Sequence, residues 1–148
     1  TKVKPAVNLL ECNPFFQRED ELAYLKSLGI QMQAWSPLSA GQNDLFHNET
    51  LCEIGAAHKK TAAQVVLRWL TQRGVAPLVK SSDPQRMKEN LDIFDFTLAE
   101  SEMRRIAGLD TGRTCFMPRD TGAAVTAFLE QAVTGSAPSG KVTDNPQK

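Results

Sequence analysis

The chain has 148 residues, and its 17 basic and 17 acidic side chains give a formal net charge of zero. With 41% hydrophobic residues, it contains enough apolar material for the core of one soluble globular unit. The balanced charge disfavours nucleic acid or an anionic membrane surface as the main partner. No apolar run approaches the roughly 20 residues needed to span a bilayer, so we expect no membrane insertion.

The three cysteines, Cys12, Cys52 and Cys115, are widely separated, and no C-x-x-C spacing occurs. This pattern disfavours a zinc site or a disulfide framework and favours reduced thiols in the cytosol. We therefore expect a cytoplasmic protein in which the cysteines are mostly small buried hydrophobic residues. No secretory signal is visible, and the first residue is Thr1 rather than Met, so we expect an upstream part to be missing.

The first third of the chain predicts a strand, a helix and a second strand. Residues 6–12 form an apolar run flanked by prolines, which indicates a buried strand. Residues 18–29 predict a helix, because three leucines share one helical stripe, acids occupy the first turn and a glycine ends it. Residues 30–35 predict a second strand, which a Ser-Pro pair terminates.

Two helices follow in the middle of the chain. Residues 48–60 predict a helix with Asn48 as its cap. Residues 61–74 predict another, which begins with a capping box between Thr61 and Gln64 and buries a valine, tryptophan and leucine face.

A third strand and two more helices complete the pattern. Residues 75–79 predict an apolar strand; Pro77 lacks the N–H that a central strand uses, so we expect it at the strand start or on an unpaired side. Residues 84–91 predict a helix. A final helix, over 97–108, is predicted to begin with a capping box at Thr97.

Strands therefore alternate with helices, and every connection is long enough for a right-handed crossover, which predicts parallel α/β architecture. Three strands alone leave two bare edges. A closed (β/α)8 barrel needs about 250 residues. If the fold is a barrel, this chain holds about three of its eight βα units.

The segment 111–148 differs in character and is expected to be a divergent tail. Within it, residues 121–133 carry an i, i+4 apolar stripe that predicts a short amphipathic helix. Residues 134–148 are polar and rich in Gly, Ser and Pro, which predicts disorder.

The sequence LVKSSDPQRMKEN, residues 78–90, combines a strand end with a basic helix start. In parallel sheets this end of the strand is where ligands bind. Asp83 is a plausible cap and Pro84 a plausible first helical residue, so free N–H groups should lie near Lys80 and Arg86. Arg86 offers a planar fork suited to a phosphate. This arrangement predicts an anion site, and a solvated basic first turn is the alternative.

Several stretches together resemble the C-terminal half of the aldo-keto reductases: KPAVNLLECNPF, GIQMQAWSPL, KKTAAQVVLRWLTQRGV and VKSSDPQRMKENLDIFDFTLAESEM. Members of that family are (β/α)8 barrels that reduce carbonyls with NADPH, without a Rossmann domain. The resemblance covers roughly residues 3–110, in order and with natural spacing. It implies that 1–110 is a partial NADP-dependent oxidoreductase domain, the C-terminal portion of a TIM-type barrel, which acts on a small-molecule aldehyde or ketone.

The resemblance also implies a set of NADP(H)-binding residues. Lys80, Ser81 and Ser82 match the residues that bind the adenosine 2′-phosphate and its ribose. Arg86 matches the arginine that covers that phosphate and the adenine face. Trp35 matches an aromatic residue that stacks on the nicotinamide ring. Ser36 and Leu38 match the start of a loop that folds over the pyrophosphate. Glu89 and Asn90 match two residues that bind the adenine. Without the neighbouring Ser-Pro-Leu, Trp35 would be read as a core aromatic.

Three positions depart from the family pattern. Leu9 stands where a glutamine usually binds the nicotinamide carboxamide, Asn13 replaces the usual His before Pro14, and Pro77 is displaced from its usual place before the lysine. Losing the carboxamide partner is expected to cost about 0.5–1.5 kcal/mol if the amide is solvated.

The family's catalytic Tyr, Lys, Asp and His belong to the N-terminal half of the barrel and have no counterparts here. The only tyrosine, Tyr24, lies mid-helix and is expected to be structural, and His47 and His58 are expected at the surface. Three interpretations remain. The chain is the C-terminal, cofactor-binding part of a carbonyl reductase; it is a non-catalytic half-barrel that binds NADP(H) or a partner; or it is a truncated product that does not fold stably. In each case we expect an N-terminal fragment or self-association to be needed to close the sheet.

Overall fold

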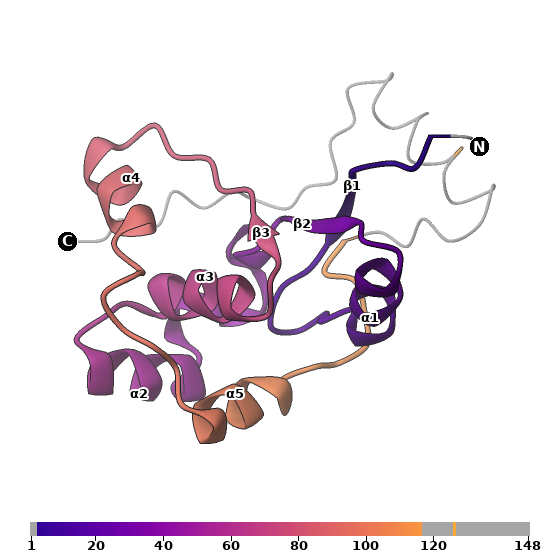
Figure 1. The fold of residues 1–148 in the computed structure, drawn as a ribbon. Coiled ribbons are helices and arrows are strands. Elements are labelled where there is room, and N and C mark those ends of the chain that lie inside the picture. Colours follow the sequence, from indigo (N-terminus) through magenta and orange to yellow (C-terminus); the bar gives the residue numbers. More distant parts are fainter. Residues whose placement is uncertain (1–2, 117–125, 127–148) are drawn as a thin grey trace. The chain divides into compact units, whose positions relative to one another are not determined.

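A computed structural model describes residues 3–116 and residue 126 (Figure 1). Apart from residue 126, the predicted helix at 121–133 lies outside the described residues, as does the predicted disorder of 134–148. The chain divides into two compact units, Thr1–Cys115 and Phe116–Lys148, and the first carries all the elements discussed below. No helix within the described residues is long and apolar enough to cross a membrane.

Three parallel strands form the sheet, in the order β1 (Val7–Glu11), β2 (Gln31–Trp35) and β3 (Ala76–Pro77). β1 and β2 pair along their whole length, from Val7 opposite Gln31 to Glu11 opposite Trp35. β3 is shorter than the predicted 75–79 strand. The three parallel strands and the helices that follow them confirm the parallel α/β architecture predicted from the sequence.

The hydrogen bond of the residue after Pro77 explains how a proline is tolerated in this sheet. The N–H of that residue, Leu78, points at β2 and donates to the Ala34 carbonyl oxygen at 2.9 Å. Successive N–H groups of a strand point to opposite sides, so the N–H that Pro77 lacks would face away from β2. Pro77 therefore occupies the unpaired side of an edge strand, one of the two positions expected from the sequence.

Five α-helices and one 3₁₀ segment accompany the strands in the described part of the chain. They are α1 (Glu19–Ser27), η1 (Ser39–His47), α2 (Glu49–His58), α3 (Ala62–Gln72), α4 (Pro84–Leu91) and α5 (Glu100–Ala107). The Asn48 cap is confirmed by a bond from the Leu51 N–H to its side chain at 3.2 Å. The Thr61 capping box is confirmed on both sides. The 3₁₀ segment was not predicted.

The predicted capping box at Thr97 is wrong. The helix begins at Glu100, and the carboxylate of Glu102 accepts the backbone N–H of Ala99 at 2.7 Å. The hydroxyl of Thr97 instead accepts a hydrogen bond from the Arg68 guanidinium at 3.0 Å. The Thr97 side chain, which the local pattern assigned to the helix cap, thus makes a tertiary contact with Arg68 instead.

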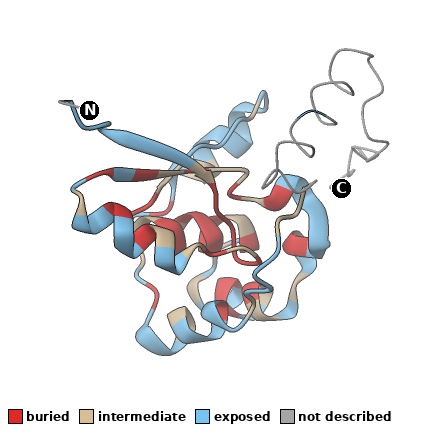
Figure 2. Ribbon diagram, turned by 90° about the vertical axis from the view of Figure 1, so that its right-hand side faces the viewer, coloured by how far each residue is buried: buried red, intermediate tan, exposed pale blue. Residues whose placement is uncertain are grey.

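α3 lies at the centre of the core (Figure 2). Its predicted apolar face is fully buried, and consists of Val65, Val66, Trp69 and Leu70. α1 contributes the buried leucines 22 and 25, and β2 contributes Met32 and Ala34. β2, which ends at the predicted cofactor residue Trp35, is therefore packed directly against the core.

β1 is not the buried strand that its sequence predicted. Val7 and Leu9 are 42% and 49% exposed, and beyond β3 Leu78 is 47% exposed. β1 and β3 are the edge strands, so neither has a neighbour on its outer side within the described sheet. In a closed barrel, the next strands and the barrel interior cover such residues. Their exposure here reflects a sheet of three strands.

Candidate cofactor site

The predicted cofactor residues lie on two segments that leave the same edge of the sheet. One begins at Trp35, the last residue of β2, and continues through Ser36; the other follows β3 and leads through Lys80 into α4. Ala34 lies opposite Pro77 in the register, so the two segments begin beside each other. The sequence prediction that both reach the carboxyl end of a parallel sheet fits this geometry.

The segment after β2 is strained and contains an unused hydroxyl. Ser36 has a left-handed backbone with φ of +50°, as have Ser39, Ala40, Asn43 and Asp44 further along. Such conformations are costly for residues other than glycine and often mark ligand-binding segments. The Ser36 hydroxyl oxygen is buried and has no hydrogen-bond partner among the described residues. Trp35 is half-buried, and Leu38 packs against the core.

The segment after β3 is held by its own hydrogen bonds. The hydroxyl of Ser81 accepts the N–H of Asp83 at 3.1 Å. One carboxylate oxygen of Asp83 accepts the N–H of Gln85 at 2.8 Å and that of Arg86 at 3.5 Å, which confirms Asp83 as the cap. These N–H groups, predicted to be free for an anion, are therefore already occupied.

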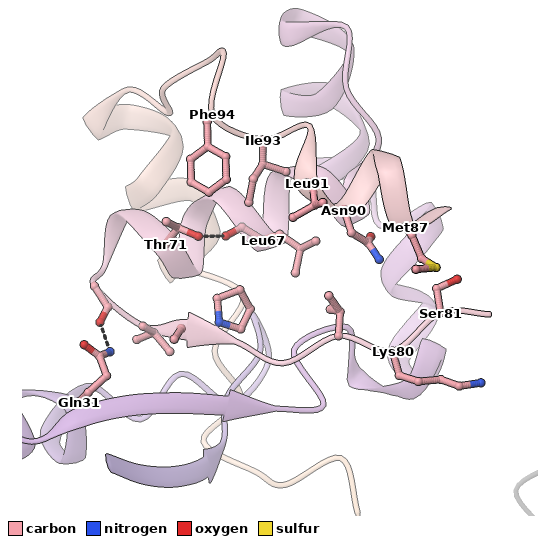
Figure 3. A pocket seen from close by; sticks show the side chains of 15 residues that line it. Gln31, Leu67, Thr71, Lys80, Ser81, Met87, Asn90, Leu91, Ile93 and Phe94 are labelled. Atoms are coloured by element: carbon pink, nitrogen blue, oxygen red, sulfur yellow. Dashed lines mark hydrogen bonds between the residues drawn. The ribbon is translucent and has the colours of Figure 1, made fainter. Parts of the chain in front are cut away.

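Two cations remain for an anion at this place. Lys80 and Arg86 are both exposed, and Figure 3 shows the Lys80 side chain extending away from the groove between α4 and β3 that is described below. The Nε of Arg86 lies 3.7 Å from the second carboxylate oxygen of Asp83, which is an ion pair longer than a hydrogen bond. Because long, exposed pairs are weak, the guanidinium can turn to another anion at little cost.

α4 is attached to the core mainly through its C-terminal end, since none of its residues is buried. The side-chain amide of Gln64 donates to the carbonyl oxygens of Glu89 at 3.2 Å and Asp92 at 2.9 Å. Lys60 bonds the Asp92 carboxylate at 2.8 Å and Asp95 at 2.9 Å, and these hydrogen bonds raise the pKa of Lys60. These anchors were missed from the sequence, because a glutamine in a capping box gives no sign of a second, tertiary role.

A groove of about 810 Å³ separates α4 from α3 and β3 (Figure 3). Its wall is mainly apolar and includes Leu67, Val79, Met87, Leu91 and Phe94. Three of the predicted cofactor residues, Lys80, Ser81 and Asn90, line it as well. Glu89 is half-exposed on the same helix and accepts a hydrogen bond from the Gln85 side chain at 2.9 Å. Ser82 is exposed and lies beside Ser81.

A second polar cluster lies at the end of β1. The buried carboxylate of Glu11 accepts the N–H of Cys115 at 2.9 Å, a hydroxyl bond from Thr114 and a bond from the Asn13 amide at 3.3 Å. Burial raises the pKa of the Cys115 thiol, which also accepts a bond from Asn43 at 3.2 Å. The predicted site did not include this cluster, because only the fold brings residue 115 to the end of β1.

The described residues show no group recognisable as the proton donor of a carbonyl reductase. Tyr24 is 65% exposed and lies within α1 rather than at the end of a strand. His47 is exposed and pairs with Asp44 at 2.8 Å. His58, which we expected at the surface, is instead partly buried beside Glu102, at 2.9 Å, and Phe96. No group of three potential metal ligands occurs among the described residues.

The model of the Aldo/keto reductase family matches residues 1–111. The chain belongs to this family. Aldose reductase B of Dictyostelium discoideum is 43% identical over 115 residues, which cover 77% of this chain and 37% of the relative. Glyoxal reductase of Bacillus subtilis is 44% identical over 109 residues, which cover 74% of this chain and 39% of the relative.

Solved aldo-keto reductases share the fold. The enzyme MGS-M4, from a Medee basin deep-sea metagenome library, is 38% identical with a TM-score of 0.77, over 81% of this chain and 44% of the other. Gox0644, a mutant of which was solved in complex with NADPH, is 36% identical with a TM-score of 0.71, over 76% of this chain and 42% of the other. This chain thus spans about two fifths of the length of these relatives.

Proposed function

We propose that this chain is the C-terminal, cofactor-binding part of an NADPH-dependent aldo-keto reductase that reduces aldehydes or ketones to alcohols. The observation that carries the proposal is the pairing of Ala34 with Pro77, which starts the Trp35 and Lys80 segments side by side. Support comes from the family membership and from a relative solved with NADPH.

The residues present suit an NADP(H) molecule. Lys80 and Arg86 supply two positive charges for the 2′-phosphate, and Glu89 and Asn90 supply polar groups for the adenine edge. The unpaired hydroxyl of Ser36 suits a phosphate oxygen of the pyrophosphate. Trp35 offers an aromatic face to the nicotinamide. Bound NADPH supplies the hydride, and these residues hold and orient the cofactor.

The proton for the developing alkoxide requires a positioned acid, which typically contributes about 10²–10⁴-fold to rate. We propose that this acid lies in other βα units of the same barrel, which would also cover the exposed edges of β1 and β3. A complementary fragment or a second copy of the chain could cover those edges. On this account the boundary between the reductase part and the tail lies near residue 110.

A second candidate is a half-barrel that binds NADP(H) without catalysis. The observation in its favour is that Tyr24, the only tyrosine of the sequence, sits exposed on α1 rather than at a strand end. Calorimetric titration with NADPH tests what both candidates share. We expect the wild type to bind NADPH and the Lys80→Ala, Arg86→Ala double variant not to bind it. Unchanged binding by the double variant would contradict the proposed site.

A further inference from the structure

The carboxylate of Asp83 lies within the proposed 2′-phosphate site, beside the arginine that should hold the phosphate. Its Oδ1 accepts the N–H groups of Gln85 and Arg86, and its Oδ2 lies 3.7 Å from Arg86 Nε. We infer that Asp83 is a specificity-determining residue, which weakens the preference for the 2′-phosphate and lets the site accept NAD(H) as well. This inference rests on the proposed function.

Asp83 is fixed in this position. Its backbone N–H is held by the Ser81 hydroxyl at 3.1 Å, and its carboxylate is held by the first turn of α4. Withdrawing the carboxylate would leave the N–H groups of that turn without their cap. A bound 2′-phosphate would therefore lie close to a carboxylate that stays in place, even when Arg86 turns towards the phosphate.

The charge balance points the same way. Lys80 and Arg86 contribute two positive charges, and Asp83 returns one negative charge, so the site offers one net positive charge to a dianionic phosphate. In contrast, a free ribose 2′-hydroxyl is a donor, and a carboxylate oxygen is a strong acceptor for it. Oδ2 is suited to that role, because its one ion pair among the described residues is longer than a hydrogen bond.

A purely structural role for Asp83 predicts a different result from a role in specificity. If Asp83 only caps α4, then Asp83→Ser, which retains a capping hydroxyl, leaves the relative affinities of the two cofactors unchanged. If Asp83 sets specificity, then removing its charge removes the repulsion between the carboxylate and the 2′-phosphate, and it also removes the acceptor for the 2′-hydroxyl. NADPH then binds more tightly and NADH more weakly.

The test is calorimetric titration with NADPH and with NADH of this chain combined with the N-terminal βα units of an aldo-keto reductase, for the wild type, Asp83→Ser and Asp83→Asn. Glu100→Gln is the matched control, because it removes an acid from the first turn of a different helix, α5. Melting curves check that each variant is folded. If Asp83→Ser does not fold, Asp83→Asn is used for the comparison. The wild type is expected to bind both cofactors. The NADPH-to-NADH affinity ratio should rise about tenfold or more in the Asp83 variants and stay unchanged in the control.

An unchanged ratio in the Asp83 variants, with NADPH still bound, would overturn the inference and leave the proposed cofactor site intact. A wild type that binds NADPH but not NADH would overturn it as well. Binding of neither cofactor to the wild type would overturn both this inference and the proposed function.

Discussion

The N–H of Leu78 donates a hydrogen bond to the carbonyl oxygen of Ala34 over 2.9 Å. Each of these two residues shortly precedes a predicted cofactor ligand: Trp35 follows Ala34, and Lys80 comes two residues after Leu78. The bond continues the β2–β3 ladder beyond Pro77, so the two ligand-bearing segments separate only after this point. A single parallel pairing thus joins the nicotinamide and the 2′-phosphate ends of the proposed site.

Arg86→Ala should weaken NADPH binding far more than NADH binding. The charge-assisted contact of the guanidinium is expected with the 2′-phosphate, which NADH lacks, and such a contact is worth about 1.5–3 kcal/mol. Arg104→Ala is the control, because Arg104 is an exposed helical arginine that pairs with an acid on its own helix, Glu100. Calorimetry with both cofactors measures the effect. Equal losses for NADPH and NADH would show that Arg86 does not bind the 2′-phosphate.

Trp35 should report cofactor binding through its fluorescence. If its ring stacks on the nicotinamide, NADP⁺ quenches its emission and Trp35→Ala loosens the cofactor. A Trp69→Phe background removes the second tryptophan, which is buried and packs against Arg73. Melting curves must first show that this background is folded. An emission spectrum that saturating NADP⁺ leaves unchanged would make Trp35 a core residue.

Gln64→Ala should destabilise the protein through α4. The substitution removes the bonds to the Glu89 and Asp92 carbonyl oxygens and the glutamine half of the Thr61 capping box. The expected cost is about 1–3 kcal/mol of unfolding free energy, since the side chain of Gln64 is buried and these three hydrogen bonds are lost together. Gln85→Ala is the control: this exposed glutamine bonds only the Glu89 side chain, and its loss should change stability by about 0.5 kcal/mol or less. Denaturant titrations that give equal values for both variants would contradict this account.

Stability should fall at alkaline pH because of Cys12. Burial raises the pKa of this thiol above its ordinary value of 9.0, so the folded state keeps a proton that the unfolded state releases. The stabilisation is fully present below the ordinary pKa and is lost as pH rises towards the folded-state pKa. Denaturation of wild type and Cys12→Ala at about pH 7 and about pH 10 measures this. The free energy of unfolding of the wild type, relative to that of Cys12→Ala, should be smaller at the higher pH. A difference between the two proteins that does not depend on pH would contradict this prediction.

The order of the elements could be predicted from the sequence because periodicity and caps are local. Asn48, Thr61 and Asp83 all cap the helices that their patterns indicated. The failures are tertiary. Thr97 binds Arg68 instead of capping, and β1 is apolar because of barrel neighbours that the described sheet does not contain.

The predicted cofactor residues came from a family resemblance, and their role remains a prediction. The sequence could suggest Asp83 as a cap, but only the structure shows that its second oxygen faces Arg86. Likewise, the hydrogen bonds of Glu11 to the segment around Cys115 and of Gln64 to α4 could not be predicted, because the partners lie far apart in the sequence. Contacts between residues far apart in sequence leave no periodic trace.

The most direct test of the central claim is NADPH oxidation with a reactive aldehyde, measured for residues 1–148 alone and for the same chain combined with the N-terminal βα units of an aldo-keto reductase. Size-exclusion elution reports the assembly state of each sample. We predict no turnover by the chain alone, which should aggregate or self-associate through its open strand edges, and NADPH-dependent reduction once the complementary units close the barrel. A soluble monomer of residues 1–148 with turnover on the order of one per second, a typical enzymatic value, would contradict the account.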